Sequence, residues 1–174
     1  YIFDSDYIDE DQALTEAEEY HKTKLTINKI IPFDAGRYNN FWIKNCIAIG
    51  LSSHFLEPLE ATSIWMSIFQ LNTLKQFLND IKIRNQHSID NYNKIVTSNV
   101  DDAMTFIYLH YVTKRNDSDF WKNFRNNTTV PKKLEDILHL IKDGNLRHYD
   151  TPLNSFPLLS YLFVCDGLEM FDKE

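Results

Sequence analysis

Residues that cross-link a chain or interrupt regular structure are scarce in this sequence of 174 residues, which has two cysteines, four glycines and five prolines. Cys46 and Cys165 lie far apart in apolar stretches, and two cysteines are too few for a disulfide framework or a thiolate zinc site. We therefore expect two buried free thiols in a reducing compartment. The six histidines show no spacing typical of metal ligands, so we expect no metal site.

Long apolar runs and targeting signals are also absent from the sequence. No stretch approaches the roughly 20 apolar residues that span a bilayer, and the N-terminal residues are acidic rather than basic and apolar. These features predict a soluble, cytoplasmic protein that does not enter a membrane. Because the first residue is Tyr1 rather than methionine, we expect the chain to be processed or to be part of a longer protein.

Basic residues do not gather in any one region of the chain. The first 20 residues hold eight of the 25 acidic residues and none of the 18 basic residues, so the remainder is close to neutral. Without a basic stripe to displace counterions from a phosphate backbone, nucleic acid is not an expected partner. The acidic segment is typical of the solvated first turns of a helix.

The residues that are present favour a globular core, since 43% of them are apolar and 14% are aromatic. Runs rich in Ile and aromatic residues predict strands, and the stretch 46–49 predicts a strand buried on both faces. Spacing of three and four between apolar residues predicts helices later in the chain. The fold class is therefore mixed α/β (α+β), with strands at the start and mostly helices after residue 60. The expected strands are 1–3, 26–32 and 42–51, and the expected helices are 9–22, 61–78, 101–113, 119–124, 131–141 and 155–168.

The most informative stretch runs from residue 42 to residue 64, where a strand ends at Gly50, a loop passes through Pro58 and a helix begins. Gly50 has no Cβ and allows a flat ligand to approach the backbone closely. Glu60 directly precedes the helix, whose first N–H groups form an intrinsic anion site. The pattern alone favours a purely structural interpretation: a turn glycine, a carboxylate that interacts favourably with the helix dipole, and Thr62 as a cap.

This stretch closely resembles a signature segment of the flavin-dependent halogenases, the tryptophan halogenase group. The matching positions are Trp42, Lys44, Asn45, Cys46, Ala48, Ile49, Gly50, Leu51, Phe55, Leu56, Glu57, Pro58, Leu59, Glu60 and Thr62. Weaker similarity lies in residues 7–13, 36–37, 109–111 and 115–121. The resemblance is specific because so many positions match in one continuous segment.

The resemblance implies the C-terminal part of a flavin-monooxygenase-like FAD fold. Residues 1–60 would complete the flavin and substrate domain, and residues 61–174 would form a helical C-terminal region. No G-x-G-x-x-G motif follows a strand here, so the FAD pyrophosphate would bind to an N-terminal portion of the same protein. The implied activity uses reduced FAD from a separate flavin reductase, oxygen and halide to make hypohalous acid. The acid then halogenates an electron-rich aromatic substrate of the indole or phenol type.

Site residues follow from the same resemblance. Glu60 would be the catalytic carboxylate beside the substrate. The flavin would meet Gly50, Leu51 and Ile64, and the halide would bind to the backbone of Thr62 and Ser63. Two positions depart from the family pattern. Ala61 stands where the family has serine, which removes a side-chain link between the flavin and substrate sites, and Ser63 replaces a glycine but keeps its N–H.

The C-terminal region gives a further expectation about the substrate. Family members that bind free tryptophan carry a Tyr-Tyr pair and an acidic-Phe-Trp segment, which residues 147–168 lack. We therefore expect a small phenol or indole to be preferred over free tryptophan. Tyr149, Phe156 and Tyr161 would line an aromatic pocket or, as packing alone favours, belong to the core.

Two other functions stay open at this point. One is a related flavin monooxygenase without halide chemistry. The other is a non-enzymatic interaction fragment, and a homo-oligomer is open in every case. The retained carboxylates of Glu57 and Glu60 argue against a pure scaffold, and the sequence upstream of Tyr1 would separate these alternatives.

Overall fold

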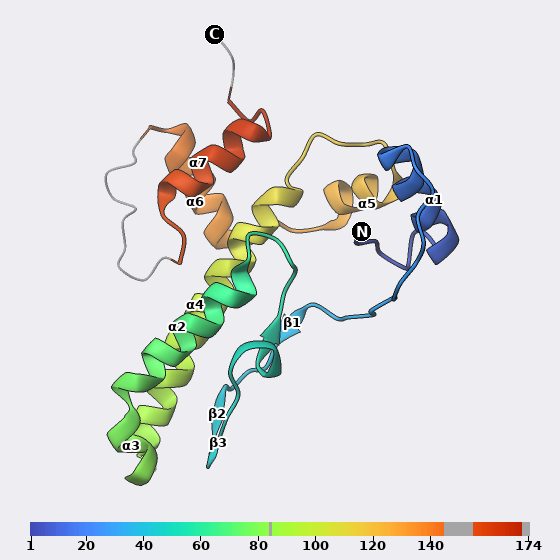
Figure 1. Cartoon of the computed structure of the whole chain (residues 1–174). Helices are drawn as coiled ribbons and strands as arrows, with labels where there is room; N and C mark the ends of the chain where they lie inside the picture. Colours follow the sequence, from blue (N-terminus) through green and yellow to red (C-terminus); the bar gives the residue numbers. More distant parts are fainter. Residues whose placement is uncertain (84, 145–154, 172–174) are drawn as a thin grey trace. The chain divides into compact units, whose positions relative to one another are not determined.

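The computed structural model of the chain describes residues 1–83, 85–144 and 155–171 (Figure 1). In these ranges the chain is helix-rich with few strands: all four short strands precede residue 60, and helices α2 to α7 follow it. This mixed, helix-rich architecture agrees with the predicted fold class. The chain divides into two compact units, Tyr1–Phe33 with Lys114–Thr129 and Asp34–Thr113 with Val130–Glu174.

The first unit contains α1 (Glu10–His21) and α5 (Asp119–Asn127). The Asp9 carboxylate accepts a hydrogen bond from the Gln12 N–H at 2.8 Å, and Gln12 Oε1 accepts one from the Asp9 N–H at 3.0 Å. This reciprocal capping box satisfies two amide groups at the start of the helix. The helix predicted from Asp9 to about Lys22 is therefore confirmed.

The two strands predicted near the N-terminus are wrong. Residues 1–3 and 26–32 form no strand, and Ile27, Ile30 and Ile31 in the second segment are exposed. β-branched residues favour extended backbone, but a strand also needs a neighbour to exchange hydrogen bonds with. Neither segment pairs with another strand within the described ranges.

The single strand predicted over residues 42–51 is instead a short hairpin followed by a turn of 3-10 helix. β2 (Trp42–Ile43) pairs antiparallel with β3 (Cys46–Ile47), and the 3-10 helix η1 (Gly50–Ser52) follows. The chain reverses between the two strands, where Lys44 adopts a left-handed conformation with a φ of 54°. The reversal breaks the alternation that a longer strand would need.

The two cysteines lie in different environments. Cys46 is exposed, so the prediction that it is buried, on a strand covered on both faces, is wrong. Cys165 is buried as predicted. Burial raises the pKa of the Cys165 thiol, because an apolar environment disfavours the thiolate.

A second strand pair holds the loop after η1 in place. β1 (Gly36–Arg37) pairs antiparallel with β4 (His54–Phe55). The Arg37 guanidinium donates to both carboxylate oxygens of Asp101, at 2.7 and 3.2 Å. The strand pair is thereby tied to the long helix that carries Asp101.

A buried amide fixes the hairpin to that same helix. Asn93 Oδ1 accepts from the N–H groups of Phe41 and Trp42 at 2.8 and 2.7 Å, and Asn93 Nδ2 donates to the Trp42 carbonyl at 2.9 Å. Three main-chain groups that would otherwise be buried without partners are satisfied by one side chain. A contact across some fifty residues of sequence therefore decides the path of the hairpin.

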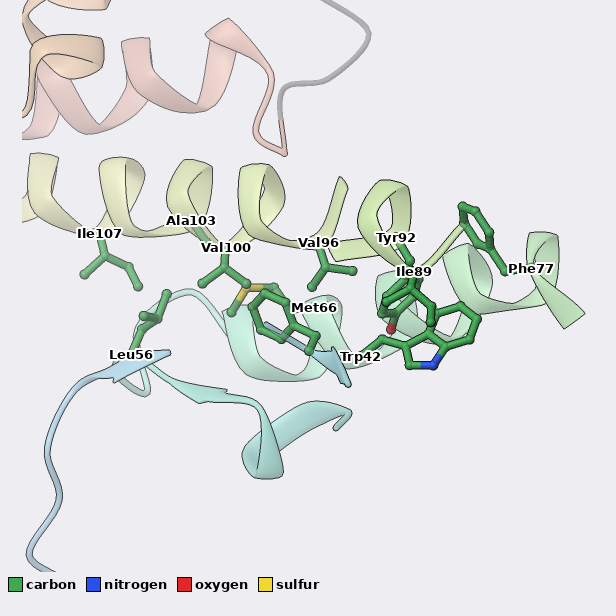
Figure 2. Close-up of a cluster of buried hydrophobic side chains, with 11 residues drawn as sticks. Trp42, Leu56, Met66, Phe77, Ile89, Tyr92, Val96, Val100, Ala103 and Ile107 are labelled. Atoms are coloured by element: carbon green, nitrogen blue, oxygen red, sulfur yellow. The ribbon is translucent and has the colours of Figure 1, made fainter. Parts of the chain in front are cut away.

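The main core of the second unit lies between two helices that run side by side, α2 (Thr62–Gln76) and α4 (Gln86–Tyr111), with the hairpin beside them (Figures 1 and 2). α4 begins well before the predicted residue 101, and α3 (Leu78–Ile83) was not predicted. No helix in the described ranges is both long and apolar enough to cross a membrane. The buried members of this core are Phe41, Trp42, Leu56, Met66, Phe77, Ile89, Tyr92, Val96, Val100, Ala103 and Ile107.

The existence of α2 is confirmed, but its predicted apolar face is largely solvent-exposed. Ile64, Ile68 and Leu71 are 68%, 53% and 51% exposed, whereas the helix buries Met66 and the polar Gln70. The spacing rule selects the most apolar stripe of a helix. In α2, the buried face is the one that carries Gln70, whose side chain bonds to the Gly50 turn before the helix. The spacing of apolar residues gives no information about such a polar contact.

A second cluster packs α6 (Lys132–Lys142) and α7 (Leu158–Gly167) against the C-terminal half of α4, in agreement with the helices predicted there. Phe156 stacks on Phe106 with ring centroids 4.2 Å apart, and Tyr161 is buried against the same ring. These two aromatics belong to the core, as packing favoured. Tyr149 lies outside the described residues. The cluster consists of Phe106, Leu109, Leu134, Ile137, Ile141, Tyr161 and Cys165.

We predict that Asn93→Leu lowers the free energy of unfolding by several kcal/mol, because each buried main-chain group left unpaired costs about 1–3 kcal/mol. Urea-induced unfolding followed by tryptophan fluorescence measures the change. Asn91→Leu is the matched control, since Asn91 is exposed on the same helix. Equal stabilities for the two variants would contradict the proposed anchoring of the hairpin.

Candidate functional site

The candidate site begins at Gly50, where the hairpin turns into η1. Its φ of +63° lies in the left-handed region, which favours glycine. A Cβ at this position would lie 2.9 Å from the Ser67 Oγ, a group on α2. Gly50 therefore meets two independent demands, a left-handed backbone and a close approach to the helix.

A buried polar network holds this turn against α2. Gln70 Oε1 accepts from the Gly50 N–H at 2.7 Å, and Gln70 Nε2 donates to the Ser53 Oγ at 3.0 Å. The Ser53 hydroxyl donates to the Gly50 carbonyl at 2.7 Å. Gln70 and Ser53 are fully buried, so both hydrogen-bonding groups of the Gly50 backbone are satisfied by side chains inside the protein.

His54 completes the network on its inner side. Its Nδ1 lies 2.8 Å from the Ser53 Oγ, which already donates its proton to Gly50, so Nδ1 is assigned as the donor. Burial lowers the pKa of His54, because the imidazolium is poorly solvated there. His54 is therefore neutral at pH 7, and its buried Nε2 meets no hydrogen-bond partner among the residues that the structure describes.

The loop then reaches Glu60 and Ala61, both of which adopt left-handed backbone with φ of 57° and 51°. Ala61 occupies the N-cap position of α2 and supplies no capping side chain. Two successive non-glycine residues in this region are uncommon and costly. The chain therefore enters α2 through a strained backbone turn that carries Glu60.

The first turn of α2 is only partly available to an anion. The Thr62 N–H donates to the Leu59 carbonyl at 3.3 Å and the Ile64 N–H to the Ala61 carbonyl at 3.1 Å, so these two N–H groups of the expected anion site are already occupied. Carbonyl groups of the preceding loop accept the hydrogen bonds of these two N–H groups. Ser63 lies between them, and its Oγ is buried without a hydrogen-bond partner in the described ranges.

Two carboxylates of the loop meet two neighbouring rings at the end of α4. Glu60 Oε1 lies 3.4 Å from His110 Nε2, and Glu57 Oε2 accepts from the Tyr111 hydroxyl at 2.6 Å. The Glu60 carboxylate is about half exposed. Burial, and then the hydrogen bond to Glu57, raise the pKa of Tyr111, so the phenol stays protonated and continues to donate.

The structure thus places the sequence-predicted site residues on one turn, loop and helix start. Glu60, Thr62, Ser63 and Ile64 are consecutive or nearly so, and Gly50 approaches the same helix one turn later, at Ser67. The sequence analysis missed the role of Gln70, because the helix was predicted from the spacing of its apolar residues and Gln70 is polar. It also gave no role to His110, although the Leu-His-Tyr segment at 109–111 was a recognisable motif.

Comparison with known proteins places this arrangement in a family. The family model described as tryptophan halogenase matches residues 1–174. The chain belongs to the tryptophan halogenase family. In the described part of this tryptophan halogenase chain, no three His, Cys, Asp or Glu side chains are grouped so that they could hold a metal ion.

Several tryptophan halogenases resemble the chain over most of its length. It is 32% identical over 126 residues to tryptophan 7-halogenase KtzQ of Kutzneria sp. (strain 744), which covers 70% of this chain and 23% of that protein. It is 35% identical over 126 residues to tryptophan 7-halogenase RebH of Lentzea aerocolonigenes, with the same two coverages. The chain therefore spans about a quarter of the length of these relatives.

A solved structure shows the same fold. BrvH, a flavin-dependent halogenase from Brevundimonas sp. BAL3, superposes with a TM-score of 0.84 and 33% identity. The match covers 99% of this chain and 35% of that one. The mixed, helix-rich architecture described above is thus the one found in a flavin-dependent halogenase.

Two of the three residues expected to meet a flavin present apolar side chains to solvent. The third, Gly50, is buried, and Ser67 of α2 fills the side on which a Cβ would stand, so Gly50 holds the turn against the helix. The apolar side chains of Leu51 and Ile64 are 71% and 68% exposed, one on η1 and one on the first turn of α2. These two exposed side chains have the apolar character that a flat ring system would contact.

We predict that Gly50→Ala lowers the free energy of unfolding by about 1–3 kcal/mol, because alanine is strained at this φ and its Cβ meets Ser67. Thermal and urea-induced unfolding measure the loss. Gly36→Ala is the matched control, since a Cβ at Gly36 would have nothing within 4 Å. A Gly50→Ala variant as stable as Gly36→Ala would show that the turn tolerates a side chain.

Proposed function

We propose that the protein containing this chain is a flavin-dependent halogenase, which uses reduced FAD, oxygen and halide to halogenate an electron-rich aromatic substrate of the indole or phenol type. The observation that carries the proposal is the presentation of Glu60. A half-exposed carboxylate stands on left-handed backbone at the start of α2, 3.4 Å from His110 Nε2. Family membership supports the same assignment.

Bound reduced flavin, with oxygen, supplies the oxidant that converts halide to hypohalous acid. The part of this chain is to place the flavin edge and to exclude solvent from it. Gly50, Leu51 and Ile64 are the proposed contacts, and Gln70 keeps the Gly50 turn in position through the Gly50 N–H. The wider FAD-binding surface is assigned to the N-terminal portion of the same protein.

The proposed halide site lies at the first turn of α2, on Thr62 and Ser63. The positive end of the helix dipole favours an anion there, and the Ser63 N–H at the second helical position has no intrahelical acceptor. Its buried hydroxyl has no hydrogen-bond partner in the described part of the chain and is proposed to donate to the same ion. Thr62 contributes less, because both its N–H and its hydroxyl already donate to the Leu59 carbonyl.

Glu60 acts on the aromatic ring in this proposal. Attack of the ring on an electrophilic halogen places positive charge on the ring, and a fixed carboxylate nearby stabilises that charge more than it stabilises the neutral substrate. The same carboxylate then accepts the proton that leaves the ring carbon, which restores aromaticity. Glu60 therefore serves first as a counter-charge and then as a general base.

The remaining partners follow from this activity. A separate flavin reductase would supply the reduced cofactor, and a small aromatic molecule would be the substrate. Phe156 and Tyr161 are core residues, so the part of the substrate pocket within the described ranges is expected near Glu60 and not among these rings. We place the protein in the cytoplasm, where reduced nicotinamide and flavin are available.

We predict that Glu60→Gln lowers the halogenation rate of the full-length protein by about 10²-fold or more, which corresponds to roughly 2.7 kcal/mol of transition-state stabilisation. Glutamine keeps the size of the side chain but has neither the charge nor the basicity. Mass spectrometry of the products, with flavin reductase, NADH and FAD present, measures the rate with chloride, bromide or iodide. The substrates are free tryptophan and a panel of simple indoles and phenols.

Glu57→Gln is the matched control, because this residue lies on the same loop but is occupied by Tyr111. We expect the control to alter stability or flavin binding more than the chemical step. Oxidation of reduced flavin by oxygen should continue at the wild-type rate in Glu60→Gln. If that variant halogenates as fast as wild type, Glu60 is not the catalytic carboxylate; hydroxylated products without halogen would favour the monooxygenase.

We predict that bromide or iodide soaked into crystals of the full-length protein gives an anomalous scattering peak beside the N–H groups of Thr62 and Ser63. The physical reasons are the helix dipole and the buried Ser63 hydroxyl, which no other described residue engages in a hydrogen bond. Ser63→Ala should weaken the peak while leaving the backbone contribution. A strong peak elsewhere beside the flavin, with none at this turn, would overturn the assignment.

A further inference from the structure

His110 is held on three sides near the end of α4. Its Nδ1 lies 3.0 Å from the Phe106 carbonyl oxygen one turn earlier, and its ring packs edge-to-face on the Phe106 ring with centroids 5.1 Å apart. Its Nε2 lies 3.4 Å from Glu60 Oε1. The side chain is 22% exposed, less than half the exposed fraction of Glu60.

These contacts determine how the ring nitrogens are used. A carbonyl oxygen only accepts hydrogen bonds, so Nδ1 must carry a proton to bond with Phe106. Nε2 is the nitrogen that faces Glu60. Only the imidazolium satisfies both contacts at once, with Nδ1–H directed to the carbonyl and Nε2–H to the carboxylate.

We propose that His110 is a positioning residue for Glu60: it holds Oε1 through Nε2–H and leaves Oε2 directed to the reacting ring. This inference rests on the proposed function. Hydrogen bonds of catalytic groups are often long in ligand-free structures and shorten in the complex with substrate, which is consistent with the 3.4 Å separation.

A positioning residue is needed at this place because Glu60 has few other restraints. Its side chain is about half exposed, and a glutamate that is free in solvent samples many rotamers. His110, in contrast, stands on a long helix and is fixed by Phe106, which belongs to the core cluster of α6 and α7. Because His110 is fixed in this way, its contact with Glu60 restricts the positions that the Glu60 carboxylate can adopt.

The neighbouring pair supports this interpretation. Glu57 is held in the same way by the next residue of α4, through the hydrogen bond from Tyr111. Two carboxylates three residues apart on the loop are thus each engaged by consecutive rings at the end of one helix. The Tyr111 bond anchors the loop, and the His110 contact orients its more exposed carboxylate.

The test compares His110→Leu, His110→Gln and the control His87→Leu, which changes an exposed histidine at the start of the same helix. With the full-length protein, we expect His110→Leu to lower kcat for halogenation by about tenfold or more, since a small misplacement of a catalytic group costs up to about 10²-fold. KM for the aromatic substrate and the rate of flavin oxidation should change little. The amide of His110→Gln can donate to Glu60, so this variant should recover most of the rate.

A double-mutant cycle separates positioning from a general loss of structure. If His110 acts through Glu60, His110→Leu should cost nothing further in the Glu60→Gln background. An equal loss of kcat in both backgrounds, or no loss in either, would overturn the inference. Wild-type activity in the same assay tests the proposed function, so failure of one is distinguishable from failure of the other.

A crystallographic comparison gives a readout that does not depend on activity. In crystals of the full-length wild type and of His110→Gln, we expect Glu60 to keep one orientation with Oε1 next to residue 110. In His110→Leu, we expect its carboxylate to turn away or to lose ordered density. An unchanged Glu60 orientation in His110→Leu would contradict a positioning role even if no halogenated product were found with any variant.

Discussion

The hydrogen bond between the Gln70 amide and the Gly50 N–H is the contact on which the candidate site depends. It turns a polar residue of α2 inward, joins the helix to the loop before it, and leaves the apolar Ile64 and Ile68 facing outward. Because Gln70 also binds Ser53, the turn is held at both of its ends. The first turn of α2 and the Glu60 backbone are fixed as a consequence, since they lie between the two bonded segments.

Local chemistry was sufficient to predict the parts of the fold whose partners are close in sequence. The Asp9 capping box is formed within three residues, and the start of α2 follows from the loop that precedes it. The strand predicted over residues 42–51 failed for the opposite reason. Its path depends on Asn93, some fifty residues later, and no pattern within the strand itself carries that information.

In the candidate site, too, the residues that could be predicted are those whose pattern is local in the sequence. Gly50 and Glu60 were identified from a continuous segment, where a glycine and a carboxylate at fixed positions carry a recognisable pattern. Gln70 and His110 were not, because their roles come from contacts with a loop that lies 20 and 50 residues earlier. A polar residue on a helix becomes informative only when the group that it meets is known.

The left-handed backbone at Glu60 and Ala61 has a consequence for how this segment tolerates change. Glycine is the residue that such a conformation accepts without strain, and each other residue costs of order 1 kcal/mol or more. A glycine at position 60 would therefore make the loop easier to fold and would remove the carboxylate. An unstrained backbone and a carboxylate side chain are therefore incompatible at position 60. Selection for stability alone would favour glycine there, so the presence of glutamate indicates a requirement other than stability.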